Sequence, residues 1–277
     1  MRIALTGASG LVGRHVMRAA EAAGHQITLL GRDSGYRLGD APDLAGHDAL
    51  IHCAFAHTPG RYRGGEGDDP AGFRRLNLDG SIRLFDSAAR SGVGRILFLS
   101  SRAVHDGHRP GTILTDDLPA RPTTLYGEVK ALAEDHLQGL ADQGFHTTAL
   151  RATGVYGAEP DHKWRGLFAD YLADRPVAPR VATEVHGDDL AAAILLLLRQ
   201  PAPPRCANVS DLVLDRHDLL SRVASLTGCP HPPPPRAEAS ALSVLRCDAL
   251  RGMGWRPGGL DLLTRSLPLM LDQGQVL

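Results

Sequence analysis

Lysine is almost absent from this chain, with only two residues among 277, so arginine supplies 28 of the 30 basic side chains. Acidic residues number 31, and the formal net charge at pH 7 is −1. A chain with so little net charge gives no electrostatic reason to bind nucleic acid or an anionic membrane surface. We therefore expect a small molecule, rather than a nucleic acid or a membrane, as the binding partner.

Cysteine is also scarce, and its positions show neither a zinc-binding nor a disulfide pattern. The four cysteines are Cys53, Cys206, Cys229 and Cys247, and none lies in a Cys-x-x-Cys motif. The 13 histidines are scattered and lack cysteine or carboxylate partners at metal-ligand spacing. We expect free thiols, no metal site and a cytoplasmic protein.

Long apolar runs are missing as well. The longest, residues 190–198, has nine residues, less than half of the roughly 20 that a membrane-spanning helix needs. The first residues lack the charged-then-apolar order of a secretion signal and begin directly with a strand pattern. Residues 190–198 are therefore expected to form a buried helix.

One of the two lysines lies in the sequence YGEVK at 126–130. In a helix, residues four apart lie on one face, one turn apart. A nearby ammonium group favours the phenolate and so lowers the pKa of tyrosine, whose ordinary value near 10 is too high for a base at neutral pH. A pair on an exposed helix without a catalytic role is the alternative. We expect Lys130 to make Tyr126 a usable proton donor or acceptor.

A glycine-rich segment, TGASGLVG at 6–13, follows a strand pattern at 2–5 and precedes a helix pattern at 14–23. This context predicts a phosphate-binding turn. Gly7 permits the tight turn, Gly10 lets the backbone approach a pyrophosphate, and Gly13 allows the helix to pack closely on the strand. The free N–H groups and the positive end of the helix dipole hold the phosphates. The expected cofactor contacts here are Gly7, Ser9, Gly10, Leu11, Val12 and Gly13.

Strand patterns alternate with helix patterns in the first half of the chain. Strands are expected at 26–30, 49–54, 95–99 and 147–151, and helices at 70–90 and 126–140. Such alternation predicts an α/β fold with a Rossmann-type, doubly wound parallel sheet, whose ligands bind at the carboxyl ends of the strands. Cys53, Ala54 and Phe55, at the end of one strand, are therefore expected to line the cofactor site.

From about residue 158 the pattern changes, and proline-rich loops occur at 201–204 and 230–235. Helices are expected at 164–174, 214–226, 239–250 and 259–271. We expect residues 1–158, completed by about 185–204, to form the cofactor-binding domain. Residues 159–184 and 205–277 are expected to form a small, mainly helical C-terminal substrate-binding lobe. The glycine-rich, charged segment 60–69 is expected to be a loop near the pocket mouth.

These motifs together resemble those of the extended short-chain dehydrogenase/reductases, the NAD(P)-dependent epimerase/dehydratase group. TGASGLVG is similar to the family's TGxxGxxG, and YGEVK to its YxxxK. LFLSS at 97–101 is similar to the strand that ends in the catalytic Ser or Thr, and MGWRP at 253–257 to the C-terminal LGWxP. The resemblance covers nearly the whole chain and says little about the substrate.

The catalytic residues that this resemblance implies are Ser101, Tyr126, Lys130 and Asn77. Ser101 is preferred over Ser100, because the family places this residue three positions before the valine that corresponds to Val104. Dehydratase members carry acidic residues at the next two positions. Here these positions hold Arg102 and Ala103, so the resemblance argues against a dehydratase.

Substrate contacts are expected from Arg102, Thr124, Gly154 and Arg165. Nucleotide-sugar epimerases of the family carry an asparagine at the position of Gly154 and an arginine at that of Ala182, where both hold the diphosphate. Because neither polar side chain is present here, the comparison argues against a UDP- or dTDP-sugar as substrate.

The choice between NAD and NADP depends on how the chain would contact the ribose 2′-position, where only NADP carries a phosphate. NAD-specific members end the second strand with an acid that bonds the ribose 2′-hydroxyl. Here the strand is followed by Gly31 and Arg32, and a guanidinium suits a 2′-phosphate. We expect NADP, held in part by Arg32 and Asp40. The alternative is NAD, with Asp33 or Asp40 bonding the ribose.

The resemblance implies an NADP-dependent oxidoreductase acting on a small alcohol or carbonyl compound, such as a sugar, lactone or keto compound. Tyr126 and Lys130 would also contact the nicotinamide ribose. One alternative is a sugar or nucleotide-sugar epimerase with a tightly held NAD. Another is a non-catalytic NAD(P)-binding regulator, which is disfavoured because Ser101, Tyr126 and Lys130 are all present. A homodimer through the catalytic helices is a family expectation.

Overall fold

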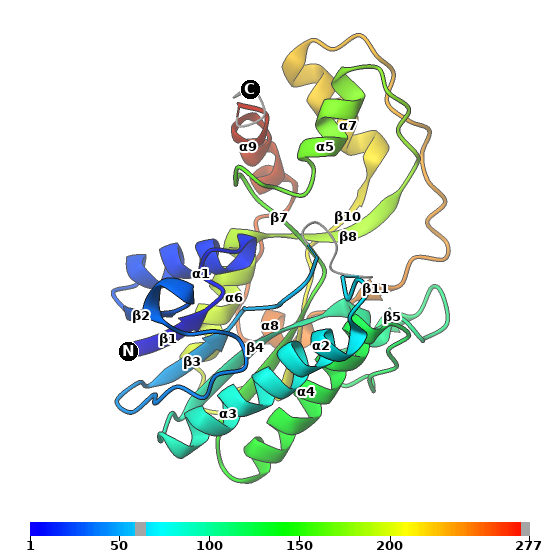
Figure 1. Ribbon diagram of the computed structural model, residues 1–277. Coiled ribbons are helices and arrows are strands. Elements are labelled where there is room, and N and C mark those ends of the chain that lie inside the picture. Colours follow the sequence, from blue (N-terminus) through cyan, green and yellow to red (C-terminus); the bar gives the residue numbers. More distant parts are fainter. Residues whose placement is uncertain (59–64, 273–277) are drawn as a thin grey trace.

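The computed structural model describes residues 1–58 and 65–272, and a parallel sheet lies at its centre (Figure 1). The six strands lie in the order β2-β1-β3-β4-β6-β9, and every neighbouring pair is parallel. They are β1 (Arg2–Thr6), β2 (Gln26–Leu30), β3 (Ala49–His52), β4 (Arg95–Ser101), β6 (His146–Ala152) and β9 (Cys206–Val209). The strand order reverses between β1 and β3, so ligands are expected at the carboxyl ends of these two strands. The predicted doubly wound α/β fold is confirmed.

Helices cover both faces of this sheet (Figure 1). α1 (Leu11–Ala22) and α6 (Gly187–Leu198) pack on each other and on one face. α3 (Gly80–Arg90) and α4 (Leu125–Asp142) cover the other face. Because both faces are covered, the strands β1, β3 and β6 are buried at every position except Arg2 and His146, rather than at alternate positions. The apolar run 190–198 lies within α6, as the sequence predicted.

The helix predicted at 70–90 has a π-helical turn in its middle. α2 (Pro70–Arg74) leads into the π-turn Arg75–Asp79, and α3 follows without a break. Asp69 caps the start, since its carboxylate accepts the Gly72 N–H at 2.7 Å. Such π-turns are rare and occur frequently at functional sites. Here the turn carries Asn77, which is 1 % exposed.

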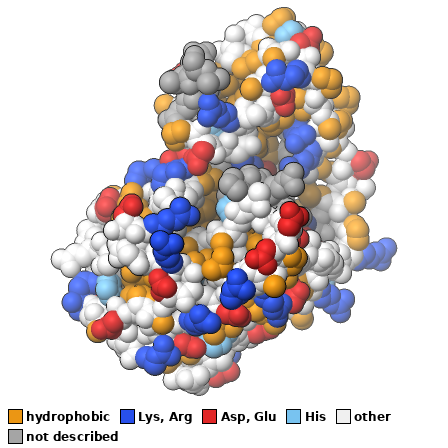
Figure 2. Space-filling model, in the orientation of Figure 1, with side chains coloured by type: hydrophobic (Ala, Val, Ile, Leu, Met, Phe, Trp, Pro, Cys, Tyr) orange, Lys and Arg blue, Asp and Glu red, His pale blue; other side chains and the backbone are white. Residues whose placement is uncertain are grey.

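A second, mainly helical part lies beyond the carboxyl edge of the sheet (Figure 1). Three strands lead into it in the order β10-β8-β7, namely β7 (Gly154–Tyr156), β8 (Val181–His186) and β10 (Leu212–Asp215). Its helices are α5 (Arg165–Leu172), α7 (Arg216–Thr227) and α9 (Gly259–Asp272). Their buried faces form one apolar cluster around Tyr156, Trp164, Phe168, Leu220 and Leu267. The surface is indented where the two parts meet (Figure 2).

Two expectations for the C-terminal third are wrong. Residues 239–250 do not form one helix, because Val244–Leu245 (β11) pairs with Ile113–Leu114 (β5) and only Asp248–Gly252 (α8) is helical. Residues 205–277 do not all belong to the lobe either, because β9 is the sixth strand of the main sheet. A polar residue interrupts the apolar pattern of β9. Its side chain, Asn208, is fully buried and donates to the backbone carbonyls of Leu114 and Arg246.

Two further points concern the loop and the helices. Of the loop expected at 60–69, residues 60–64 lie outside the described part of the chain, and residues 65–68 form turns before α2. Among residues 1–58 and 65–272, no helix is both long enough and apolar enough to cross a membrane.

Candidate active site

The glycine-rich turn joins β1 to α1 through contacts that exclude side chains. Gly7 has a φ of 72°, and a Cβ there would lie 2.6 Å from the Ala54 nitrogen. A Cβ on Gly13 would lie 2.0 Å from the Gly7 carbonyl oxygen. Gly10 donates to that same carbonyl at 3.0 Å and is the N-cap of α1. Because glycine has no capping side chain, the first N–H groups of α1, from Leu11 onward, face outward and suit an anion.

The segment after β3 is tied to this turn by a buried histidine. His52 Nδ1 lies 2.6 Å from the Thr6 hydroxyl, which also accepts the Ala54 N–H at 3.1 Å. His52 Nε2 lies 2.9 Å from the Ser81 hydroxyl on α3. Burial lowers the pKa of His52 to about 3, so the ring is neutral at physiological pH. His52 therefore has a structural role and places Cys53 and Ala54 beside the glycine turn, where the sequence located them.

Asn77 holds Ala56, which lies further along the segment that follows β3. Its Oδ1 accepts the Ala56 N–H at 2.7 Å, and its Nδ2 donates to the Ala56 carbonyl at 2.8 Å. Nδ2 also donates to the Phe73 carbonyl at 3.0 Å. In this structure Asn77 therefore positions the loop that carries Phe55, and its side-chain groups are occupied by backbone partners.

The two serines at the end of β4 have different surroundings. Ser100 is buried and donates to Glu134 on α4, which also pairs with Arg151. Ser101 is partly exposed and its hydroxyl oxygen accepts the Ala103 N–H at 3.2 Å. Successive strand residues point to opposite faces, so only Ser101 presents its hydroxyl at the ligand edge of the sheet. The choice of Ser101 over Ser100 as the catalytic serine stays a prediction.

Tyr126 and Lys130 lie one turn apart on α4, and an aromatic ring contacts both. Lys130 is 3 % exposed, and its Nζ donates to the Leu99 carbonyl at 2.6 Å. The ammonium lies 4.4 Å from the centre of the Phe55 ring and 4.5 Å from that of Phe98. The ring of partly exposed Tyr126 meets Phe55 edge-on at 5.1 Å. Burial lowers the pKa of Lys130 to about 7, an effect that the neighbouring Cys53 and Glu134 partly oppose.

The N-terminus of α4 lies against the turn that follows Ser101. Thr124 caps the helix, since its hydroxyl accepts the Gly127 N–H at 3.1 Å. A Cβ on Gly127 would lie 2.6 Å from the Ala103 carbonyl oxygen. The absence of a side chain there lets the helix approach closely. The Tyr126 backbone is therefore held beside Ser101. The Thr124 hydroxyl, expected at the substrate, has a capping role in this structure.

Of the residues expected at the 2′-phosphate of NADP, Arg32 lies at the end of the strand next to the glycine turn. Arg32 follows β2 by two residues, and Leu30, the last residue of β2, is in register with Thr6 of β1. Arg32 is exposed at the start of a 3₁₀ turn. Asp40 is also exposed, and its carboxylate accepts the Arg37 N–H at 2.6 Å.

The other predicted substrate residues lie in different places. Arg102 contacts Asp106 at 3.3 Å and donates to the Ser243 carbonyl at 3.4 Å, so it holds the C-terminal segment beside the 3₁₀ turn Arg102–His105 that follows β4. Gly154 is exposed at the start of β7. Arg165 is exposed at the start of α5 in the helical part.

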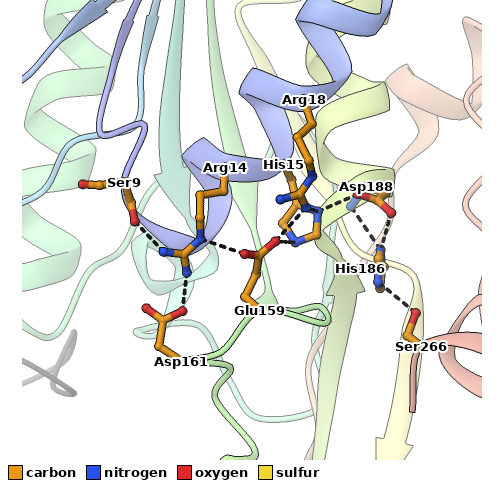
Figure 3. A network of polar contacts seen from close by, with 9 residues as sticks. All are labelled: Ser9, Arg14, His15, Arg18, Glu159, Asp161, His186, Asp188 and Ser266. Atoms are coloured by element: carbon orange, nitrogen blue, oxygen red, sulfur yellow. Dashed lines mark hydrogen bonds and ion pairs between the residues drawn. The ribbon is translucent and has the colours of Figure 1, made fainter. Parts of the chain in front are cut away.

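A polar network connects the glycine turn to the helical part (Figure 3). Arg14 of α1 donates to the Ser9 carbonyl at 2.7 Å and pairs with Glu159, which follows β7, at 2.8 Å. Glu159 also pairs with Arg18 at 2.6 Å. The network continues through His15, Asp188 and His186 to Ser266 on α9. Sequence reasoning missed these residues because they lie far apart in the chain.

A second missed group lies at Gly154. Lys163, the other lysine of the chain, forms an ion pair with Glu184 of β8. A Cβ on Gly154 would lie 2.4 Å from both Lys163 Nζ and Glu184 Oε2. The rarity of lysine was the one sequence signal that could have drawn attention to Lys163.

Comparison with known proteins places this geometry in a family. A sequence model of the NAD dependent epimerase/dehydratase family matches residues 3–210. An uncharacterized protein of Mycobacterium tuberculosis is 27 % identical in an alignment 252 residues long, which covers 84 % of this chain and 24 % of that protein. The chain thus spans about a quarter of the length of this relative.

Solved structures resemble the whole chain. The UDP-glucose 4-epimerase of Thermotoga maritima, solved with UDP-glucose, has a TM-score of 0.79 at 22 % identity and covers 98 % of this chain and 100 % of its own. The UDP-glucose 4-epimerase of Thermus thermophilus, solved with NAD, has a TM-score of 0.77 at 24 % identity and covers 100 % and 99 %. This chain belongs to the NAD dependent epimerase/dehydratase family, as its motifs predicted.

Proposed function

We propose that the protein is a nicotinamide-dependent oxidoreductase that uses Ser101, Tyr126 and Lys130. The observation that carries this proposal is their convergence at the carboxyl end of β4. Ser101 ends the strand, Lys130 donates to the Leu99 carbonyl of the same strand, and close packing at Gly127 holds Tyr126 beside them. A hydroxyl, a phenol and an ammonium group at one strand end are the parts needed for proton transfer at a substrate oxygen.

Each side chain has a distinct task in this proposal. Ser101 donates a hydrogen bond to the substrate oxygen and fixes its position. Tyr126 transfers the proton to that oxygen during reduction, or accepts it during oxidation, while the bound nicotinamide supplies or takes the hydride. Lys130 stabilises the tyrosinate, and it would also hold the ribose of a bound nicotinamide cofactor.

The glycine turn is the proposed binding site for the cofactor pyrophosphate, and Arg32 gives the site a preference for NADP. The uncapped N–H groups at the start of α1 supply the donors for the pyrophosphate. The exposed Arg32 guanidinium suits a 2′-phosphate, whereas the Thermus thermophilus epimerase was solved with NAD. Direct titration with both dinucleotides decides between them.

Replacing Arg32 by alanine is expected to weaken NADP binding by roughly ten- to a hundredfold, because a charge-assisted hydrogen bond contributes about 1.5–3 kcal/mol. NAD binding should change by much less, since NAD has no 2′-phosphate. Calorimetric titration of wild type and variant measures both affinities. Arg90→Ala is the control. Arg90 is an exposed arginine at the end of α3, just before β4 begins, and this edge of the sheet lies opposite the proposed cofactor site. A wild-type preference for NAD would overturn the NADP assignment and point to Asp33 or Asp40.

An epimerase that oxidises and re-reduces one carbon is the second candidate function. It is favoured by the structural similarity to two UDP-glucose 4-epimerases over nearly the whole chain. An epimerase regenerates its cofactor in every cycle, so it is expected to retain the nucleotide through purification. A dehydrogenase must exchange its cofactor. Mass spectrometry of nucleotide released from the purified, denatured protein distinguishes the two.

Even if the protein is an epimerase, we expect that it does not bind UDP or UDP-glucose with micromolar affinity in the presence of cofactor. A diphosphate entering the pocket needs cations or N–H donors to replace its hydration. Gly154 and Ala182 have no polar side chain, and the Lys163 ammonium near Gly154 is already paired with Glu184. Isothermal titration of the cofactor-loaded protein is the measurement. Micromolar binding of either ligand would make a nucleotide-sugar epimerase the better interpretation.

A further inference from the structure

We propose that Phe55 is a positioning residue, whose ring, together with that of Phe98, holds Lys130 as a charged ammonium beside Tyr126. This inference concerns the site of the reaction proposed above and rests on that reaction for its effect on turnover. The two rings contact the ammonium from different elements, Phe98 from β4 and Phe55 from the loop after β3.

Lys130 is buried without a carboxylate partner of its own. Its side chain is almost fully buried, and none of the ion pairs within residues 1–58 and 65–272 includes it. Its Nζ donates to the Leu99 carbonyl at 2.6 Å, which uses one of its three N–H donors. Burial without a counter-charge is costly for an ammonium group, and it lowers the pKa of Lys130 to about 7. Another source of attraction is therefore needed if Lys130 is to stay charged at neutral pH.

The titratable groups around Lys130 offset its burial only in part. The Cys53 thiol is protonated at neutral pH, because burial raises its pKa to about 12. The His52 ring is neutral as well, because burial lowers its pKa to about 3. Glu134 carries a negative charge, but it shares that charge with the buried guanidinium of Arg151 at 2.7 Å. None of these groups is therefore a dedicated counter-ion for the ammonium.

Two aromatic faces supply the remaining attraction. The Lys130 ammonium lies 4.4 Å from the centre of the Phe55 ring and 4.5 Å from that of Phe98. A cation over an aromatic ring is attracted by the negative face of the ring, and this attraction is stronger at a desolvated site than at an exposed one. Both rings therefore favour the charged form of Lys130 over the neutral form.

The Phe55 ring also contacts Tyr126 and is held in place by its neighbours. It meets the Tyr126 ring edge-on at 5.1 Å and the Phe73 ring edge-on at 5.4 Å. The next residue, Ala56, is fixed by two hydrogen bonds to the Asn77 side chain on the π-turn. The π-turn thus helps to fix the ring that contacts both the ammonium and the phenol.

A leucine at position 55 distinguishes this role from simple apolar packing. Leucine keeps an apolar side chain beside the ammonium but has no ring face. Loss of a buried contact between a cation and a ring should lower the pKa of the lysine by about one unit, a tenfold change in its protonation equilibrium. Phe55 is the better target of the two rings, because it is partly exposed on a loop, whereas Phe98 is buried in β4.

The scarcity of lysine lets the Lys130 ammonium be observed directly. The chain has two lysines, so protein labelled with ¹³C at the lysine ε-carbon gives two side-chain signals in an NMR spectrum. Lys163→Arg leaves one signal and thereby assigns that of Lys130. Titration of the 277-residue chain with pH then gives the pKa of Lys130, and Lys163 is the reference in the same spectrum.

Phe55→Leu should lower the pKa of Lys130 by about one unit and leave that of Lys163 unchanged. Phe55→Tyr retains a ring and should keep the wild-type value. Phe73→Leu is the matched control, because it removes a ring of the same size that contacts the Phe55 ring. Thermal melting shows whether each variant is folded, and Phe55→Ile is a second apolar replacement.

Two results would overturn the proposal. One is a folded Phe55→Leu protein in which the pKa of Lys130 is unchanged or raised. The other is a Phe73→Leu protein in which this pKa falls as far as in Phe55→Leu, since the effect would then come from packing rather than from the ring at the ammonium.

The pH dependence of turnover connects the ammonium to the proposed reaction. Charged Lys130 stabilises the tyrosinate in that reaction, so turnover should fall as the pH rises through the pKa of Lys130. Phe55→Leu should therefore move this alkaline limit of turnover down by about one pH unit. A purely structural defect would instead lower turnover by the same factor at every pH.

Comparison with Tyr126→Phe separates this inference from the proposed reaction. If Tyr126→Phe retains turnover while Phe55→Leu lowers the pKa of Lys130, the catalytic assignment fails and the role of the ring stands. If Tyr126→Phe loses turnover while the pKa of Lys130 does not depend on Phe55, the reverse holds.

Discussion

Tyr126→Phe is expected to lower turnover by at least about 10²-fold, the usual contribution of a general acid–base group. The change removes one oxygen and the proton it carries. The ring is retained, so its edge-on contact with Phe55 at 5.1 Å can persist. Cofactor affinity should therefore change little. The measurement pairs steady-state turnover, on a substrate found by screening NAD(P)H consumption with aldehydes, ketones and sugar lactones, with a cofactor titration.

Tyr171→Phe is the matched control for this experiment. Tyr171 lies on α5 in the helical part, and its hydroxyl donates to the His231 carbonyl at 2.5 Å. The same oxygen is removed, but at a position that packs in the lobe core, so turnover should be unchanged. Near-normal turnover of Tyr126→Phe would show that the catalytic assignment is wrong. A comparable loss in Tyr171→Phe would show that the assay reports folding rather than catalysis.

Local sequence patterns were sufficient for the parts of the site made by consecutive residues. The glycine turn could be predicted because a strand, a tight turn and a helix leave a recognisable spacing, and Gly7 and Gly13 are required by backbone contacts. Tyr126 and Lys130 could be predicted as a pair because helical periodicity fixes residues four apart. The doubly wound sheet followed from the alternation of strands and helices.

Contacts between distant segments were not predictable in the same way. Glu184 and Lys163 meet only because β8 pairs with β7 beside Gly154, and no local pattern encodes that pairing. The strand β9 was missed because buried Asn208 interrupts its apolar run, and the hydrogen bonds that satisfy this side chain come from residues 94 and 38 positions away. In both cases the polar residue contacts residues that are distant in sequence. Its role can therefore be recognised only in the folded chain.

The same distinction applies to Glu134, which no local pattern of residues singles out. Its carboxylate accepts from Ser100 of β4 and pairs with Arg151 of β6 at 2.7 Å, with side chains 2 % and 5 % exposed. Arg151 also donates to the carbonyls of Asp116 and Leu118 at 3.3 and 3.2 Å. Glu134 therefore fixes helix α4 to the two strands that end at the proposed site.

Glu134→Ala is expected to lower the free energy of unfolding by about 3–5 kcal/mol, because it leaves the Arg151 guanidinium buried without its carboxylate partner. Chemical denaturation followed by circular dichroism measures the change. Glu128→Ala is the control on the same helix, since Glu128 pairs with Arg74 at 2.5 Å with side chains 48 % and 43 % exposed. An exposed pair of this kind contributes less than about 1 kcal/mol. Equal losses in the two variants would show that burial of the Glu134 pair does not determine its effect, and that helix α4 is held to the sheet by apolar packing alone.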